Sequence, residues 1–237
     1  MTSATLRYQF QPVGLVHSCF KEKFAIPRQP ALAPAARGHI ELLPPYDSAE
    51  ALQGLEGVSH LWLTFIFHQA MPKPNELRLK VRPPRLGGNK KVGVFSTRST
   101  HRPNPIGLSV VKLDRIEGSI LYISGIDLLD QTPVLDIKPY IPYSDAIHQA
   151  ENPMAPESPQ PIMVTFLDSA LQQANDHQQR LKQPIVALIE QTLAQDPKPA
   201  YQTPDPQRLY GVKVWDLEVK WQYPCADQIQ VISVSRL

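Results

Sequence analysis

Short apolar segments recur along the first 142 residues, separated by proline, glycine and charged residues. Several of these segments alternate apolar and polar positions or are rich in branched and aromatic side chains, a pattern that predicts strands. The predicted strands are residues 8–18, 38–43, 58–69, 92–95, 107–116, 119–129 and 133–141. A short helix is predicted over 46–53, with Asp47 or Ser48 as its N-cap. Strands this frequent, with turn residues between them and little helix, indicate an antiparallel or mixed β-barrel.

The pattern changes after residue 142. Residues 143–161 are polar and rich in proline, which is typical of a linker. Beyond them the helical periodicity is stronger, and the expected elements are a strand over 162–166, a helix over 168–181, a second helix from Pro184 to about 194, and a hairpin of strands 212–223 and 228–237.

These patterns predict a mainly β protein with two domains. We expect a β-barrel domain over residues 1–142, a linker over 143–161 and a small α+β domain over 162–237. The last domain is near the lower size limit for independent stability, so we expect it to pack on the barrel or on a second subunit.

Composition excludes several classes of protein. No window of uncharged apolar residues is long enough to span a membrane, and the first residues lack a signal-peptide pattern, so we expect a cytoplasmic protein. The two cysteines, Cys19 and Cys225, are too few for a disulfide framework, and the seven histidines show no metal-binding spacing, so no metal is expected. No phosphate loop or dinucleotide fingerprint occurs.

The net charge of +2 is distributed unevenly. Residues 73–102 contain nine lysines and arginines against the single acid Glu76, whereas the rest of the chain is net acidic. A basic segment on an acidic body is typical of a protein that binds a polyanion. A solvated basic loop is the alternative, and the patch alone does not distinguish RNA, DNA and phosphorylated small molecules.

The stretch 93-GVFSTRSTHRPNPIGLS-109 concentrates polar groups between two apolar segments. Arg98 and Arg102 carry planar donor groups that suit a carboxylate or phosphate. Pro103 and Pro105 restrict the backbone, and Gly107 permits close approach of another chain segment. The stretch therefore predicts a pre-organised loop that binds an anion, although a proline-stiffened turn with arginines in water would have the same composition.

The strings GVFSTRS and RPNPIGLS also resemble the signature of the tRNA threonylcarbamoyladenosine N6-methyltransferases, which use S-adenosylmethionine on a β-barrel. Further strings fit the same family in order: 22-EKFAIPRQP-30, 54-GLEGVSHLW-62, 67-FHQ-69, 81-VRPPRLGG-88, 127-DLLDQTPVLDIKPYIP-142 and 196-DPKPAY-201. The resemblance spans nearly the whole chain and is weakest over 143–165 and 168–183.

The resemblance implies S-adenosylmethionine as cofactor, bound by residues carried over by position: Pro27, Arg28, Gln29, His68, Gln69, Arg98, Leu108, Asp127, Leu128, Leu129 and Asp130. Arg28 or Arg98 would suit its carboxylate, and Asp127 or Asp130 its ammonium or ribose hydroxyls. Leu108 and Leu129 would flank the adenine.

The implied reaction is methyl transfer to N6 of threonylcarbamoyladenosine beside the anticodon of tRNA. That nitrogen must lose a proton, and the candidate acceptors are Asp130, Asp136, His101 and Tyr201. The residues expected to follow the phosphates of the anticodon loop are Arg78, Arg82, Arg85, Lys90 and Lys91.

Trp62, Tyr140 and Tyr201 are candidate stacking partners for bases. A homodimer is a further expectation. Two alternatives stay open at this point: a methyltransferase acting on a small anionic molecule, and a non-catalytic nucleic-acid-binding barrel.

Overall fold

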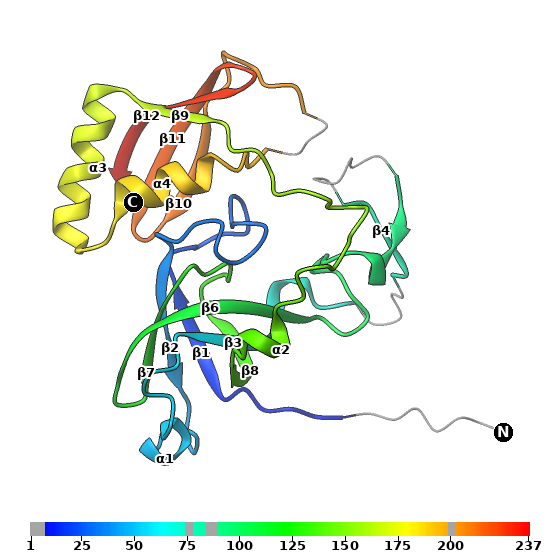
Figure 1. Ribbon diagram of the computed structural model, residues 1–237. Helices are drawn as coiled ribbons and strands as arrows, with labels where there is room; N and C mark the ends of the chain where they lie inside the picture. Colours follow the sequence, from blue (N-terminus) through cyan, green and yellow to red (C-terminus); the bar gives the residue numbers. More distant parts are fainter. Residues whose placement is uncertain (1–7, 74–77, 84–89, 199–201) are drawn as a thin grey trace.

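The computed structural model describes residues 8–73, 78–83, 90–198 and 202–237 (Figure 1). Within this part of the chain, a closed barrel has the strand order β1-β2-β7-β6-β3-β8. Its strands are β1 (Gly14–Ser18), β2 (Arg37–Leu42), β3 (His60–Ile66), β6 (Ile106–Glu117), β7 (Ile120–Ser124) and β8 (Thr132–Pro139). All its neighbouring strands pair antiparallel. The predicted mainly β fold with a barrel is confirmed.

The alternation in the sequence becomes the two faces of the barrel wall. In β3, Leu61, Leu63 and Phe65 are buried, whereas Trp62 and Thr64 between them are partly exposed on the outer face. Successive strand residues face opposite sides, so one apolar row per strand fills the interior. Each fully buried leucine contributes about 2 kcal/mol through the area that it removes from water.

Several strands are shorter than predicted. The first begins at Gly14, and β7 ends at Ser124 because Gly125 has a φ of +69° and turns the chain away from the sheet. The segment predicted as a strand over 58–69 ends in a short 3-10 helix, η1 (His68–Ala70). The helix predicted over 46–53 is reduced to α1 (Ala49–Leu52).

The described residues of the basic segment form a small two-stranded pairing beside the barrel (Figure 1). It pairs β4 (Lys80–Val81) with β5 (Val92–Gly93), and the chain then enters the 3-10 helix η2 (Val94–Ser96). The strand predicted over 92–95 was therefore wrong in its second half. There the Val94 N–H donates to the Leu79 carbonyl across the hairpin at 2.9 Å.

The C-terminal residues form a second sheet, β10-β11-β12-β9, covered by two helices (Figure 1). Its elements are β9 (Met163–Phe166), α3 (Asp168–Leu181), α4 (Ile185–Leu193), β10 (Tyr210–Val214), β11 (Leu217–Cys225) and β12 (Gln228–Arg236). The single strand predicted over 212–223 was wrong. Trp215, with a φ of +53°, and Asp216 make a tight turn that divides it into β10 and β11.

The second sheet packs directly on one end of the barrel (Figure 1). Phe20 bridges to Val214, and the Trp215 N–H donates to the Cys19 carbonyl at 2.7 Å. The buried apolar residues of both sheets form one continuous cluster. The segment between the sheets contains the short helix α2 (Pro142–Asp145). Across the described ranges, no helix has the length and apolar character that a membrane span requires.

Candidate functional site

Hydrogen bonds of its own polar groups hold the conformation of the loop from Thr97 to Pro105. Arg102 points inward and donates to the Thr97 carbonyl at 2.7 Å, and the Thr97 hydroxyl donates to the Val94 carbonyl at 2.9 Å. At its far end, Pro105 accepts a 2.8 Å bond from the Phe67 N–H. These bonds fix the loop against η1 and η2. Arg102 therefore contributes to the stability of the loop.

Arg98 points from this loop toward two of the predicted cofactor residues. Its Nη1 donates to Gln29 Oε1, and its positive charge acts on Asp127. The Asp127 Oδ1 atom is buried and has no hydrogen-bond partner among the described residues. Burial raises the pKa of Asp127 from 3.8 to about 6, a shift that the Ser109 hydroxyl and the Arg98 guanidinium oppose. A buried carboxylate oxygen without a partner is costly unless a ligand supplies a donor.

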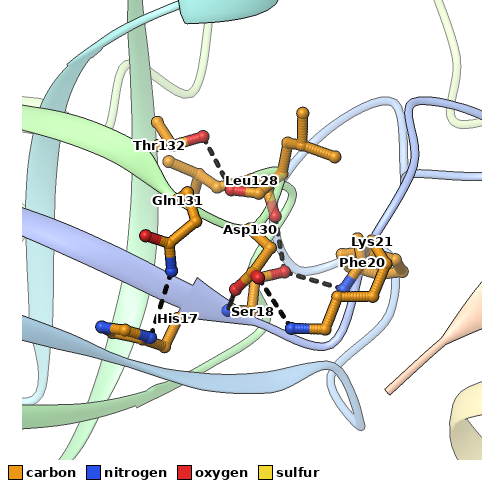
Figure 2. A network of polar contacts seen from close by, with 9 residues as sticks. His17, Ser18, Phe20, Lys21, Leu128, Asp130, Gln131 and Thr132 are labelled. Carbon is orange, nitrogen blue, oxygen red and sulfur yellow. Dashed lines mark hydrogen bonds and ion pairs between the residues drawn. The ribbon is translucent and has the colours of Figure 1, made fainter. Parts of the chain in front are cut away.

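Asp130, at the other end of the same run, has a different role (Figure 2). Its Oδ1 accepts the Ser18 N–H at 2.8 Å, and its Oδ2 forms a 2.8 Å ion pair with Lys21. Its own N–H donates to the Phe20 carbonyl at 2.9 Å. Both oxygens are thus occupied in joining the end of β1 to the segment before β8, which favours a structural role.

The two leucines between them belong to the core. Leu128 is 1% exposed, and its carbonyl accepts the Ser18 hydroxyl at 2.7 Å. Leu129 is 9% exposed, and its carbonyl accepts the Thr132 hydroxyl at 2.7 Å. Figure 2 shows the bond between Ser18 and Leu128. Both leucine side chains are therefore buried, and the role of Leu129 beside an adenine ring stays a prediction.

Arg28 faces the C-terminal sheet. Its Nη2 donates to the Gln195 and Asp196 carbonyls, each at 3.2 Å, and its Nε is buried without a partner among the described atoms. Burial lowers the pKa of Arg28, and the charge of Asp196 opposes that shift. Pro27 beside it is buried. Arg28 thus contacts the far unit, whereas Gln29 contacts Arg98.

Asp196 and Lys198 belong to the string DPKPAY. The Asp196 carboxylate pairs with Lys198 at 2.8 Å and accepts the Tyr223 hydroxyl at 2.8 Å. Lys198 is 7% exposed. These contacts join the segment after α4 to β11 within the C-terminal unit, and the Asp196 carbonyl is the atom that Arg28 contacts from the N-terminal unit. Tyr201, at its end, lies outside the described residues.

His68 and Gln69 form most of η1. The Gln69 carbonyl accepts a 2.5 Å bond from Lys23 Nζ, which brings this segment beside the one that contains Gln29. Burial lowers the pKa of His68, and the positive charge of Lys23 adds to the effect. Leu108 is 57% exposed and pairs with Thr64 on the outer face of the barrel. Its neighbour Ser109 faces the opposite side, so the Leu108 side chain is not brought to Asp127.

The remaining candidates divide between two places. Asp136 lies on the outer face opposite Thr64, where it contacts Lys138 and accepts the Ile137 N–H at 3.0 Å. His101 is exposed on the signature loop. It lines a pocket of about 420 Å³ together with Arg78, Lys80, Val81, Arg82, Lys91 and Ser99. Lys90 adjoins that lining, and Arg85 lies outside the described residues.

Of the proposed stacking residues, Trp62 is already engaged. Its Nε1 donates to Asp145 in α2 at 2.8 Å, and its ring lies 5.9 Å from that of Tyr140. Sequence reasoning had not singled out Ser99, Ser109, Lys21 or Lys23 as site residues. For Ser99 and Ser109 the sequence did offer a signal, since Ser99 directly follows Arg98 and Ser109 directly follows Leu108.

The residues gathered here suit an amino-acid-like cofactor. Gln29, Arg98 and Asp127 supply a neutral acceptor, a guanidinium and an unpartnered carboxylate oxygen in one place, which matches a ligand that carries both a carboxylate and an ammonium group. Among the described residues, no group of three or more histidine, cysteine or acidic side chains has a metal-binding arrangement.

Comparison with known proteins identifies the family to which this fold belongs. Residues 15–146 match the family described as the tRNA-methyltransferase O N-terminal domain, and residues 159–237 match the TrmO C-terminal domain. RcsF of Pseudomonas aeruginosa, provisionally named as an S-adenosylmethionine-dependent methyltransferase, is 61% identical over 97% of this chain and 99% of its own. The tRNA (adenine(37)-N6)-methyltransferase of Escherichia coli is 43% identical over 91% of this chain and 93% of its own.

A solved structure agrees with these matches. The crystal structure of TrmO from Pseudomonas aeruginosa superposes with a TM-score of 0.86 at 52% identity, covering 99% of this chain and 100% of that one. The resemblance predicted from the signature strings is therefore confirmed, and the chain belongs to the TrmO family of tRNA methyltransferases.

Proposed function

We propose that this protein is an S-adenosylmethionine-dependent tRNA methyltransferase that methylates N6 of threonylcarbamoyladenosine beside the anticodon. The enzyme class is the one named for its Escherichia coli relative. The observation that carries the proposal is that Arg98, on a loop that also lines a cationic pocket, meets Gln29 and the buried Asp127 carboxylate from other segments. Arg98 of this loop then suits the cofactor, whereas Ser99 and His101 of the same loop line the pocket that suits a polyanion.

The contacts narrow the roles left open by the sequence. Arg98, and not Arg28, is assigned to the cofactor carboxylate, because Arg28 is bound to carbonyls of the C-terminal unit. Asp127, and not Asp130, is assigned to the ammonium or the ribose hydroxyls, because Asp130 is bound to Lys21 and Ser18. A charge-assisted bond of this kind contributes about 1.5–3 kcal/mol.

The reaction needs positioning more than an activated protein nucleophile. S-adenosylmethionine supplies a methyl group on a positively charged sulfur, which is open to in-line attack. The N6 nitrogen is urea-like and weakly nucleophilic, so the braced loop contributes by orienting the two reactants. N6 must also lose its proton. Of the candidate acceptors that the structure describes, His101 is the one on the pocket lining, whereas Asp130 and Asp136 contact lysines elsewhere.

The anticodon loop is the proposed binding partner within the tRNA. Arg82, Lys90 and Lys91 are described residues of the basic segment, and Arg82 and Lys91 line the pocket beside the signature loop. Single-stranded loops expose bases that proteins bind by stacking and edge contacts while cationic side chains follow the phosphates.

Radiolabelled methyl transfer tests the proposal directly. The purified protein is incubated with labelled S-adenosylmethionine and total tRNA that carries or lacks the threonylcarbamoyl group. We expect label only in the modified pool, at the modified adenosine. Label in small anionic molecules alone would contradict the RNA substrate, and cofactor-independent RNA binding without transfer would favour a non-catalytic module.

Three further features belong to the proposal. The proposed domains are a barrel over 1–142, a linker over 143–161 and an α+β unit over 162–237. Limited proteolysis tests this division, because the first cuts should fall in the linker. A homodimer is supported by exposed apolar side chains, including Phe95 at 78% and Leu108 at 57% exposure, and light scattering measures the oligomeric state. A cytoplasmic location follows from the tRNA substrate, and cell fractionation tests it.

A further inference from the structure

A cationic pocket lies next to the residues assigned to the cofactor. Its volume is about 420 Å³, and four of its lining residues are cations, Arg78, Lys80, Arg82 and Lys91. Ser99 and His101 complete its polar wall, and none of the described residues that line it is acidic. Lys80, Arg82 and Lys91 bring positive charge together there, a distribution that suits an anionic ligand.

The pocket and the cofactor residues share one loop. Ser99 and His101 face the pocket, while Arg98 between Thr97 and Ser99 bonds to Gln29. The Ser99 hydroxyl accepts the His101 N–H at 3.2 Å, so its own proton is free to be donated to a ligand. Arg102 stabilises the loop by donating a hydrogen bond to the Thr97 carbonyl. The pocket lining and the Arg98 contact to Gln29 therefore lie on the same loop, on adjacent residues of the chain.

The proposed substrate carries an anion at the right place. Threonylcarbamoyladenosine differs from adenosine by a side group attached at N6 that ends in a carboxylate and a hydroxyl. The methyl acceptor and this carboxylate are thus only a few bonds apart, so a substrate whose N6 lies beside the cofactor holds its carboxylate close by. A backbone phosphate is common to all tRNAs, whereas this carboxylate is present only after the modification.

We propose that the pocket lined by Arg82, Lys91, Ser99 and His101 binds the carboxylate of the threonylcarbamoyl group and so selects modified over unmodified adenosine. This inference rests on the proposed function. Arginine binds a carboxylate with paired donors, and lysine and serine add single donors. A site built for a charged group discriminates strongly against the analogue that lacks it, because the donors are then left without a partner.

Binding of three short anticodon stem-loops tests the inference. They carry adenosine, threonylcarbamoyladenosine or its uncharged methyl ester beside the anticodon, and affinities are measured by fluorescence anisotropy with the full-length protein. We expect the wild type to prefer the free carboxylate over both others by about tenfold to a hundredfold, the range for one or two charge-assisted bonds. The Arg82→Gln and Lys91→Gln variants should lose most of that preference.

Lys90→Gln is the matched control, because it removes the same charge next to the pocket but outside its lining. It should weaken all three stem-loops by a similar factor and keep the preference. If Arg82→Gln and Lys91→Gln also weaken all three equally, the pocket binds phosphate and the inference is wrong. Equal wild-type binding of acid and ester overturns it as well.

Methylation of the same stem-loops separates this inference from the proposed function. Methylation of the acid with little of the ester supports both. Equal methylation of acid and ester leaves the proposed function standing and overturns only the carboxylate site. Absence of methylation of any stem-loop, with the cofactor bound, overturns both. Thermal unfolding of each variant verifies that the fold is retained.

Discussion

Replacing Asp127 by asparagine should stabilise the protein at neutral pH while weakening cofactor binding. The carboxylate has a buried oxygen with no donor among the described residues, and its pKa is raised from 3.8 to about 6, chiefly by burial. The folded state therefore binds this proton more tightly than the unfolded state does. Asparagine keeps the shape of the side chain and removes the charge whose burial is unfavourable.

The pKa difference gives both the direction and the size of the effect. Between about pH 4 and pH 6 the folded protein holds the extra proton, so the free energy of unfolding falls as the pH rises through this window. Above this pH window the carboxylate is ionised in both states, and the folded state carries the full energetic cost of burying its charge. At 1.36 kcal/mol for each pKa unit, the interval from 3.8 to about 6 corresponds to about 3 kcal/mol. The asparagine amide also needs an acceptor, so we expect a gain of about 1–3 kcal/mol at neutral pH.

Urea unfolding followed by tryptophan fluorescence measures the effect. Asp127→Asn should be more stable than the wild type at about pH 7.5, and the difference should shrink until the pH falls below about 3, where the wild-type carboxyl is protonated in both states. Asp176→Asn, on the exposed face of α3, controls for the change of side-chain chemistry. A variant less stable at neutral pH, or a difference that does not depend on pH, would refute this account of Asp127. Calorimetry should show weaker S-adenosylmethionine binding in the same variant.

Three other outcomes are expected. Arg98→Gln should weaken S-adenosylmethionine binding by roughly several-fold to hundreds-fold, the loss of a charge-assisted bond, with little change in thermal stability; Arg37→Gln on the barrel exterior is the control, and unchanged calorimetric affinity would remove Arg98 from the site. Gly107→Ala should destabilise the fold by about 1–3 kcal/mol or more, because its Cβ would lie 2.3 Å from the ring of Phe65, itself 4% exposed; Gly211→Ala, where the nearest atom is 3.8 Å away, should have little effect in the same thermal scan. The affinity for tRNA should fall linearly with salt on logarithmic axes because lysines and arginines displace counterions from the phosphates, and flat affinity across low and moderate salt would argue against the basic segment as the RNA contact.

The barrel was predictable because its strands carry the alternation that a half-buried sheet imposes. The divided strand at Trp215 was not, since its turn contains neither glycine nor proline and only the φ of +53° reveals it. The β4–β5 hairpin was missed for a similar reason, because strands of two residues have no periodicity to detect.

The sequence predicted which segments contribute to the candidate site but not the role of each residue in them. Asp127 and Asp130 are the same residue type in one short run, and sequence alone treats them alike. What separates them is Lys21 and the Ser18 N–H, more than a hundred residues earlier in the chain. Arg28 and Arg98 were ambiguous in the same way until the carbonyls of Gln195 and Asp196 were placed beside Arg28.

Residues 28 and 29 are neighbours in the chain that hold two distant parts of the molecule. Arg28 is fastened to the segment after α4, and Gln29 bonds to the loop that carries Arg98. One peptide bond separates these anchors, so the position of the C-terminal sheet sets how much freedom Gln29 has before the cofactor arrives. Order that exists beforehand lowers the entropy lost on binding. A chain shortened to its barrel should therefore bind the cofactor more weakly, because Gln29 would lose the ordering that the C-terminal sheet supplies through Arg28.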